Sequence, residues 1–307
     1  MFSNSVWSIL LIAAQVAAAP ARPVARGTIL LDSNPTRSDL ADVSANVLQQ
    51  LTLFAEYSTA TYCSSNLQST GNSLTCAAGN CPTVEAASTK TLYEFENQAD
   101  YGDVAGYVAA DSTNKLLVVA FRGTTSADTW IANLNFAADD IDSVCSGCEA
   151  HGGFWQAWGS VADTLTAEIE SAAKEYPDYT LVFTGHSFGG AMATLGATVL
   201  RNAGHTIELY TYGSPRVGNT ALAEYITAQG SLFRVTHTDD IVPNLPPTTF
   251  GFSHPSPEYW ITSDNGETVT TSDIQVVKGI DSTEGNAGTV WIDGTAAHGW
   301  YIIQMGC

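Results

Sequence analysis

The residue best placed for nucleophilic chemistry in this sequence is Ser187, at the centre of the pentapeptide GHSFG at 185–189. The pentapeptide fits the G-x-S-x-G pattern, in which a sharp turn after a strand exposes a serine hydroxyl in a strained backbone conformation. Side chains two positions before and after the serine would collide in such a turn, so Gly185 and Gly189 fit where other residues would not. The pattern predicts a serine that attacks a carbonyl carbon with the help of a base.

The sequence around the pentapeptide favours this interpretation over that of an ordinary Gly/Ser turn. An apolar run at 181–183 is typical of a buried strand, and the Ala-rich stretch at 188–200 is typical of a buried helix. Strand, tight turn and helix is the order that the motif requires. The N-terminus of that helix would present free N–H groups to an oxyanion forming beside Ser187.

A serine nucleophile needs a base, and the base needs a carboxylate that orients it. After a turn of this kind the acid comes first along the chain and the base follows. Asp239 and Asp240 directly follow a predicted strand at 231–236, and Asp240 is favoured because it adjoins an apolar run. His254 and His298 are the candidates for the base, and His298 is favoured because it lies in a late loop near the C-terminus.

Other chemistries find little support in the sequence. It contains no H-E-x-x-H, P-loop or G-x-G-x-x-G motif, so we expect neither a metal nor a cofactor. We interpret His151 and His186 as structural hydrogen-bond formers, although His186 adjoins the nucleophile. The net charge of −20, from 11 basic and 31 acidic residues, argues against nucleic acid or anionic lipid as a partner and favours a neutral substrate.

The N-terminus has the pattern of an export signal. Residues 9–19 form an apolar run that is too short to span a membrane, and we interpret 1–19 as a signal peptide although it lacks a basic residue. The Arg/Pro-rich stretch 20–26 is interpreted as a pro-segment, which leaves 27–307 as a single domain. No other segment is long and apolar enough for a transmembrane helix, so we expect a secreted protein.

Six cysteines in a secreted chain predict three disulfides, for which sequence alone leaves many connectivities open. Cys76 with Cys81 and Cys145 with Cys148 are close enough to pair locally, which would leave one long-range pair. The alternative for the C-x-x-C at 145–148 is half a zinc site or a redox pair, but no second C-x-x-C follows. The six are Cys63, Cys76, Cys81, Cys145, Cys148 and Cys307.

Helices alternate with apolar strands along the rest of the chain, which indicates an α/β fold with a mostly parallel central sheet. We expect a helix over 38–62, a hairpin of strands at 103–110 and 115–121, and a helix over 155–176. The strand at 115–121 is apolar on both faces and is predicted to be central. It ends in the turn RGTT at 122–125, which is suited to an oxyanion donor.

The segment 126–136 follows this turn and carries apolar residues at helical spacing. Two interpretations remain open. It is either a surface helix docked on the core or a lid that covers the site in water and opens on lipid. The apolar residues are Trp130, Ile131, Leu134 and Phe136.

With these residues in view, the chain resembles the filamentous-fungal class 3 lipases, a family that also includes feruloyl esterases. The resemblance covers essentially all of the chain after about residue 45. The matching stretches include LFAEYSTATYC at 53–63, VVAFRGT at 118–124, WIANLNF at 130–136, CSGC at 145–148, FTGHSFGGAMATL at 183–195, YGSPRVGN at 212–219, HTDDIVPNLPP at 237–247 and SPEYWI at 256–261.

The resemblance implies an α/β-hydrolase fold, a catalytic triad, two oxyanion donors, a lid over about residues 125–135 and a disulfide pairing. The implied triad is Ser187, Asp240 and His298; the oxyanion donors are Thr124 and the N–H of Phe188; the lid residues are Trp130, Ile131 and Leu134; and the disulfides are Cys63–Cys307, Cys76–Cys81 and Cys145–Cys148. The sequence departs from the family pattern at Phe188 and Gly299, where leucine is usual, and at Asp239, where close relatives have asparagine.

The function implied by the resemblance is that of a secreted triacylglycerol lipase, which hydrolyses neutral glycerides at a lipid–water interface through an acyl-enzyme. We expect it to act as a monomer. A feruloyl esterase or other small-ester carboxylesterase on the same scaffold is the alternative, but the apolar residues of 126–136 favour lipid over cell-wall phenolics. A non-catalytic binding protein is a further alternative, against which the complete triad argues.

Overall fold

The computed structural model describes residues 43–99, 102–124, 135–289 and 295–307. These residues belong to one compact unit, Leu40–Cys307. The predicted signal peptide at 1–19 and pro-segment at 20–26 lie outside the described residues and stay predictions.

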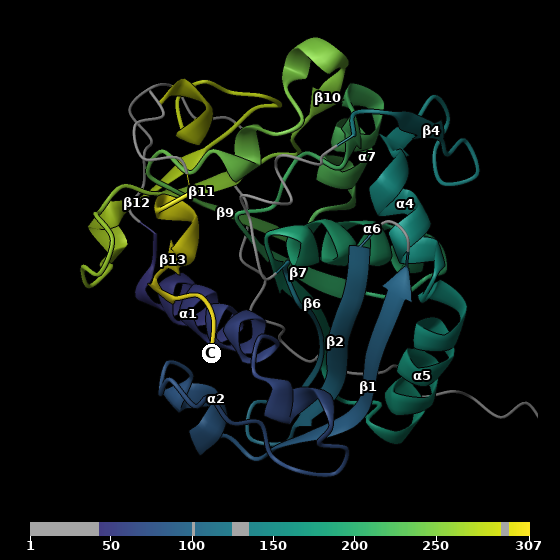
Figure 1. Ribbon diagram of the computed structural model, residues 1–307, viewed down its shortest axis with the longest axis vertical. Helices are drawn as coiled ribbons and strands as arrows, with labels where there is room; N and C mark the ends of the chain where they lie inside the picture. The colour runs from purple at the N-terminus through teal and green to yellow at the C-terminus, as the bar shows by residue number, and fades with distance from the viewer. Residues whose placement is uncertain (1–42, 100–101, 125–134, 290–294) are drawn as a thin grey trace, which may run out of the picture. The chain divides into compact units, whose positions relative to one another are not determined.

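A central sheet of eight strands runs through the described part of the chain (Figure 1). Its order is β1-β2-β3-β6-β7-β9-β11-β12, and the five strands from β3 to β11 are parallel to one another. The pairs β1–β2, β2–β3 and β11–β12 are antiparallel. The strands are β1 (Thr89–Ala99), β2 (Gly102–Asp111), β3 (Leu116–Phe121), β6 (Thr180–His186), β7 (Ile207–Tyr212), β9 (Leu232–His237), β11 (Glu258–Ile261) and β12 (Ile274–Val277).

Parallel strands bring the candidate site residues to one edge of the sheet. β6 lies between β3 and β7, and β7 pairs with β9. Because parallel strands present their carboxyl ends at the same edge, the residues that follow Phe121, His186 and His237 gather there. The turn with Thr124, the nucleophile and the candidate acid all belong to these three connections.

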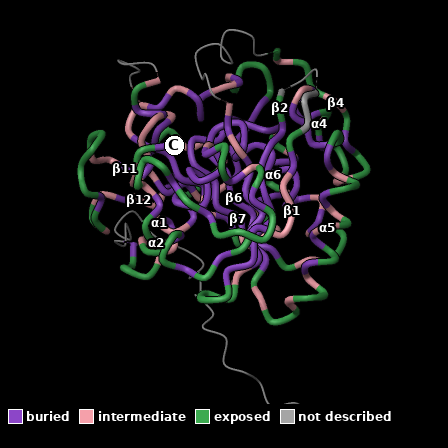
Figure 2. The backbone as a smooth tube through the Cα atoms, turned by 60° about the horizontal axis from the view of Figure 1, so that its bottom comes forward, coloured by how far each residue is buried: buried purple, intermediate pink, exposed green. Residues whose placement is uncertain are grey.

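Helices cover both faces of the sheet. Along β3, Leu117 and Val119 belong to a core shared with α4, α5 and α6, whereas Val118 and Ala120 belong to a second core shared with α1. Because β3 is buried on both faces, its residues are apolar without interruption. Figure 2 shows the buried backbone concentrated around β6 and β7. The helices are α1 (Ala45–Ala60), α2 (Pro82–Ala86), α4 (Gly152–Gly159), α5 (Ala162–Glu175), α6 (Phe188–Asn202) and α7 (Thr220–Gln229).

Shorter elements complete the described fold. A second sheet has the order β10-β8-β5-β4, and a two-stranded ribbon joins β13 to β14. Their strands are β4 (Ala138–Asp140), β5 (Glu149–His151), β8 (Gly218–Asn219), β10 (Phe252–Ser253), β13 (Trp300–Tyr301) and β14 (Ile303–Gln304). The 3₁₀ turns are η1 (Ser64–Leu67), η2 (Val242–Asn244), η3 (Thr248–Phe250), η4 (Thr271–Asp273), η5 (Asn286–Gly288) and η6 (Ala297–Gly299).

Two helices differ from the sequence expectations. α1 begins at Ala45, later than expected, because the Ser44 hydroxyl caps it by accepting the N–H of Val47 at 3.2 Å. The helix expected over 155–176 is two helices, α4 and α5. The two helices separate after Gly159. The hydroxyl of the next residue, Ser160, donates a hydrogen bond to a backbone carbonyl of α4.

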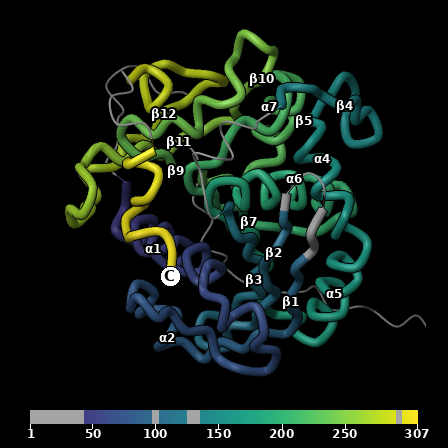
Figure 3. Tube along the Cα trace, in the orientation of Figure 1, coloured from purple at the N-terminus to yellow at the C-terminus, as the bar shows by residue number. Residues whose placement is uncertain are grey.

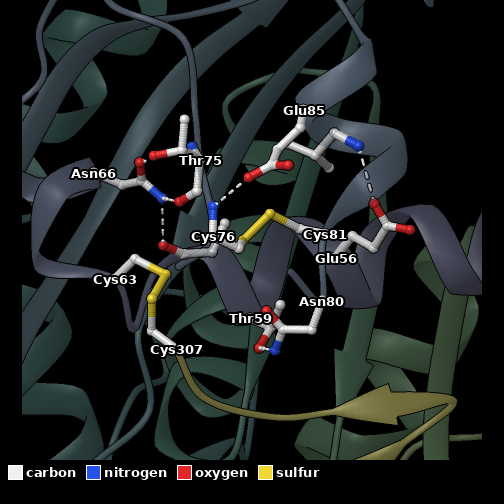
Figure 4. The surroundings of a disulfide bond; sticks show 12 residues. Glu56, Thr59, Cys63, Asn66, Thr75, Cys76, Asn80, Cys81, Glu85 and Cys307 are labelled. Atoms are coloured by element: carbon white, nitrogen blue, oxygen red, sulfur yellow. Dashed lines mark hydrogen bonds between the residues drawn. A yellow bond between two sulfur atoms is a disulfide. The ribbon is translucent and has the colours of Figure 1, made fainter. Parts of the chain in front are cut away.

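A disulfide fastens the end of the chain to the end of α1. Cys63 pairs with Cys307, and the C-terminal trace passes beside α1 (Figures 3 and 4). The side-chain amide of Asn80 donates to the carbonyls of Gln304 and Gly306 at 2.8 and 2.7 Å. The other pairs are Cys76–Cys81 and Cys145–Cys148, as the resemblance implies. The C-terminal end of the tail that follows His298 is therefore held beside the C-terminal end of α1.

Candidate active site

Ser187 lies in the turn between β6 and α6 with a strained backbone, at φ 59° and ψ −129°. The strain depends on the two flanking glycines. A Cβ on Gly185 would collide with the backbone of Gly189, and a Cβ on Gly189 would collide with the carbonyl of Phe121. The Ser187 N–H donates to the carbonyl of Tyr212 on β7 at 2.8 Å, which fixes the turn to the neighbouring strand.

The candidate base and acid are joined directly. His298 Nδ1 donates to Asp240 Oδ2 at 2.7 Å, and both side chains are buried. The other carboxylate oxygen of Asp240 accepts the N–H of Val242 at 2.9 Å. An imidazole whose Nδ1–H is held in this way leaves its Nε2 free to accept a proton, which is the arrangement a general base requires.

Tyr301 is a partner of the acid that the sequence analysis missed. Its hydroxyl donates to Asp240 Oδ2, the same oxygen that accepts from His298. Burial, followed by the charge of Asp240, raises the pKa of Tyr301 well above its ordinary value, so the hydroxyl stays protonated and donating. No motif marks this tyrosine, and its position three residues after His298 on β13 is the one hint in the sequence.

The two alternative residues occupy other environments. Asp239 is half-buried and accepts from the hydroxyl of Thr238 at 3.3 Å. His254 Nε2 donates to the carbonyl of Pro243 at 2.7 Å, and burial, with the charges of two arginines, holds the pKa of His254 well below its ordinary value. Of the candidates for acid and base, the structure brings Asp240 and His298 together.

Ser187 Oγ and His298 Nε2, the two atoms that would exchange a proton, are each buried and have no hydrogen-bond partner among the described residues. The imidazole nevertheless lies beside the turn at 185–189, which we call the elbow. A Cβ on Gly213 would lie 2.9 Å from His298 Nδ1, and the preceding residue, Tyr212, accepts the N–H of Ser187. Catalytic hydrogen bonds in enzymes without substrate are often long and tighten only in the complex. The free atoms are the two that this chemistry needs to be available.

The turn with Thr124 lies directly against the elbow. A Cβ on Gly123 would lie 3.1 Å from the Cβ of Ser187, and the Thr124 hydroxyl is buried with no partner in the described part of the chain. Phe188 begins α6, where the first N–H groups have no intrahelical acceptor. The ring of Phe188 packs edge-on against Phe154 in the core, at 5.8 Å between centroids. Backbone donors can therefore face an oxyanion without competition from the ring.

The predicted lid residues Trp130, Ile131 and Leu134 lie outside the described residues. Within the described ranges, no group of three or more His, Cys, Asp or Glu side chains could hold a metal ion. In those same ranges, no helix combines the length and apolar character needed to cross a membrane.

Known proteins resemble this chain over most of its length. It matches the family model described as Lipase (class 3) over residues 118–250. It is 45% identical over 275 residues to secreted mono- and diacylglycerol lipase A of Penicillium cyclopium, covering 88% of this chain and 90% of that protein. It is 38% identical over 304 residues to secreted mono- and diacylglycerol lipase 1 of Fusarium solani, covering 98% of this chain and 88% of that protein.

A solved structure agrees with this relationship. The mono- and diacylglycerol lipase of Aspergillus oryzae superposes with a TM-score of 0.80 at 42% identity, covering 84% of this chain and 97% of that one. The strained serine after β6, the parallel sheet and the sequence identity over most of the chain lead to one assignment. The chain belongs to the class 3 lipase family of carboxylic ester hydrolases, with the α/β-hydrolase fold.

Proposed function

We propose that this protein is a secreted serine lipase that hydrolyses neutral glycerides at a lipid–water interface, with Ser187, His298 and Asp240 as its triad. The observation that carries the proposal is the 2.7 Å hydrogen bond between His298 and Asp240, beside a serine held in a strained elbow. The secreted relatives in Penicillium cyclopium and Fusarium solani support export of this chain as well.

In the proposed mechanism Ser187 Oγ attacks the ester carbonyl carbon while His298 Nε2 takes its proton. Asp240 holds the resulting imidazolium, and the N–H groups of Thr124 and Phe188 donate to the oxyanion of the tetrahedral intermediate. The imidazolium returns its proton to the leaving alcohol as the C–O bond breaks, which leaves the acyl group on the serine. A water molecule activated by the same base then releases the fatty acid and restores the hydroxyl.

The relatives' names refine the substrate. Both sequence relatives are mono- and diacylglycerol lipases, and they cover most of this chain, so we propose partial glycerides as the preferred substrates and triacylglycerols as the alternative. The test compares initial rates on emulsified monoolein, diolein and triolein with the rate on methyl ferulate. We expect diolein and monoolein to be hydrolysed fastest. Fastest hydrolysis of triolein would reverse the substrate order, and a preference for methyl ferulate would reject a lipase.

Phe250 is proposed to contact the lipid. It is 58% exposed at the end of η3, and its ring lies 4.8 Å from that of Phe136, which directly follows the proposed lid. Exposed aromatic side chains favour insertion into a lipid surface. We expect Phe250→Ser to lower the initial rate on emulsified diolein about fivefold, because about 1 kcal/mol of apolar burial at the interface is lost.

The control for this prediction is the same variant on a water-soluble ester, where no interface exists and the rate should not change. Phe250→Trp keeps a large apolar ring and should retain the emulsion rate. Equal losses on emulsion and soluble ester would place Phe250 in the chemistry or the stability of the fold instead of at the interface.

We further propose that residues 27–307 form the mature catalytic domain, that 1–19 are removed on export, and that the lid spans about 125–135. The mature protein is proposed to be a monomer. N-terminal sequencing of the secreted protein and sedimentation analysis test these points; retention of residues 1–19 or a stable dimer would reject them.

A further inference from the structure

Two buried histidines contact consecutive carbonyl groups of the turn that carries His298. His186 Nε2 lies 2.9 Å from the carbonyl oxygen of His298, and His237 Nδ1 lies 2.9 Å from that of Ala297. Both carbonyls belong to η6 (Ala297–Gly299). Since a carbonyl oxygen only accepts hydrogen bonds, each ring nitrogen bonds to the turn only when it carries the proton.

The strands that carry these histidines lead into the turns that contain the other two triad members. His186 is the last residue of β6 and directly precedes Ser187, and His237 is the last residue of β9 and stands three residues before Asp240. The backbone of the turn with His298 is therefore held to the ends of the two strands that present the nucleophile and the acid. The His298–Asp240 bond alone would fix the imidazole at one atom.

His186 is fixed as a neutral donor. Its Nδ1 lies 2.7 Å from the hydroxyl of Tyr62, and its side chain is buried. Burial, followed by the charge of His298, holds the pKa of His186 well below its ordinary value. The neutral ring carries its proton on Nε2, where the carbonyl of His298 accepts it, and Nδ1 accepts from Tyr62. With both nitrogens engaged, His186 has no free atom with which to act as a base.

Tyr62 connects this histidine to two other parts of the site. A Cβ on Gly123 would collide with its hydroxyl, so the phenol lies against the turn that leads to Thr124. The next residue, Cys63, forms the disulfide to Cys307. The hydroxyl that orients His186 therefore lies against the turn with Thr124, and the backbone that carries it adjoins the disulfide to the C-terminus.

His237 lies between two acceptors. Its second nitrogen, Nε2, is 2.9 Å from the carbonyl of Ser263, and the ring is fully buried. The tautomer of His237 that carries its proton on Nδ1 donates to the carbonyl of Ala297. The imidazole therefore lies between η6 and the loop that follows β11, which contains Ser263.

We propose that His186 and His237 are positioning residues that hold the turn of His298 in register with Ser187 and Asp240. This proposal rests on the function proposed above. The turn itself is short and irregular, so its own backbone bonds are few, and a displacement of about 1 Å at a catalytic group can lower turnover about 100-fold. The two histidines act through the backbone of the turn and touch no substrate.

The test uses variants of matched shape that differ in one N–H group. His186→Gln keeps an N–H near the position of Nε2, whereas His186→Met has similar length and no donor; His237→Asn and His237→Leu form the corresponding pair at Nδ1. The maximal rate and KM are measured on p-nitrophenyl butyrate. The maximal rate is divided by the concentration of sites titrated with a p-nitrophenyl alkylphosphonate, which gives kcat per titrated site. We expect kcat per titrated site to fall about 10- to 100-fold in the Met and Leu variants with little change in KM. The Gln and Asn variants should recover most of that loss.

His205→Gln, which alters a histidine in the turn after α6, is the control and should keep kcat per site. Unchanged kcat per site in both donor-free variants, with only fewer titratable sites or a lower unfolding temperature, would overturn the proposal by showing a purely structural role.

If the Met or Leu variants do not fold, Tyr62→Phe is the variant to test. It removes the hydroxyl that fixes the proton of His186, and an unchanged kcat there would also overturn the proposal. A wild-type protein that neither turns over the ester nor reacts with the phosphonate would instead reject the proposed function.

Discussion

Replacing Ser187 with alanine is expected to lower kcat on p-nitrophenyl butyrate by about 10⁶-fold, as removal of a triad nucleophile does in other serine hydrolases. The fold should survive, because the change removes one oxygen atom that has no hydrogen-bond partner among the described residues. The strained backbone at φ 59° is unchanged by the substitution, since alanine meets the same steric limits as serine there. Stopped assays over long times measure the residual rate.

The control is the thermal unfolding temperature of Ser187→Ala, which should match that of the wild type. A variant that keeps more than a small fraction of wild-type turnover, once contamination by wild-type enzyme is excluded, would reject Ser187 as the nucleophile.

The second large effect is expected for Asp240→Asn, with a loss of about 10⁴-fold in kcat. Among the described residues, the carboxylate accepts hydrogen bonds from three donors: the Val242 N–H at one oxygen, and the His298 ring and the Tyr301 hydroxyl at the other. An amide has only one oxygen, so its NH₂ group would face a donor. If it faced His298, the imidazole would shift its proton to Nε2 and could no longer accept one from Ser187.

Asp239→Asn is the matched control for this prediction. The same chemical change is made one residue earlier, on a half-buried side chain, whereas the carboxylate that His298 Nδ1 contacts is that of Asp240. It also restores the residue that the family pattern has there, so kcat should stay close to the wild-type value. Equal losses in the two variants would mean that charge near the site matters and that the direct bond to His298 does not.

The elbow could be predicted from sequence because its chemistry is local. An apolar strand, two glycines and an apolar helix stand next to one another in the chain, and the collision predicted for side chains at 185 and 189 is the one that the structure gives to a Cβ on Gly185. The central position of β3 was also predictable, since a strand buried on both faces must be apolar at every position.

What the sequence did not reveal depends on contacts between distant segments. Tyr301 meets Asp240 across 61 residues, and His186 meets the turn of His298 across 112 residues. Histidine and tyrosine at these positions carry no local pattern that distinguishes a positioning role from ordinary packing. Our interpretation of His186 as a structural hydrogen-bond former agrees with its contacts, but the choice of partner came only from the fold.

The boundaries of α1 and of α4 show a second limit. Several serines and aspartates precede α1, and each is a good N-cap by type. The choice of Ser44 depends on which hydroxyl reaches an N–H three residues later, here that of Val47. Likewise, the break after Gly159 lies within an amphipathic pattern that continues across it, so periodicity alone predicts one helix.

The central claim is that Ser187 is activated by His298 and Asp240, and covalent labelling tests it most directly. A p-nitrophenyl alkylphosphonate should react once per chain, with release of p-nitrophenolate, and peptide mass spectrometry should place the phosphonyl group on Ser187. The reaction should be abolished in Ser187→Ala and strongly slowed in Asp240→Asn. A phosphonyl group on another residue, or labelling of Ser187→Ala at the wild-type rate, would contradict the account.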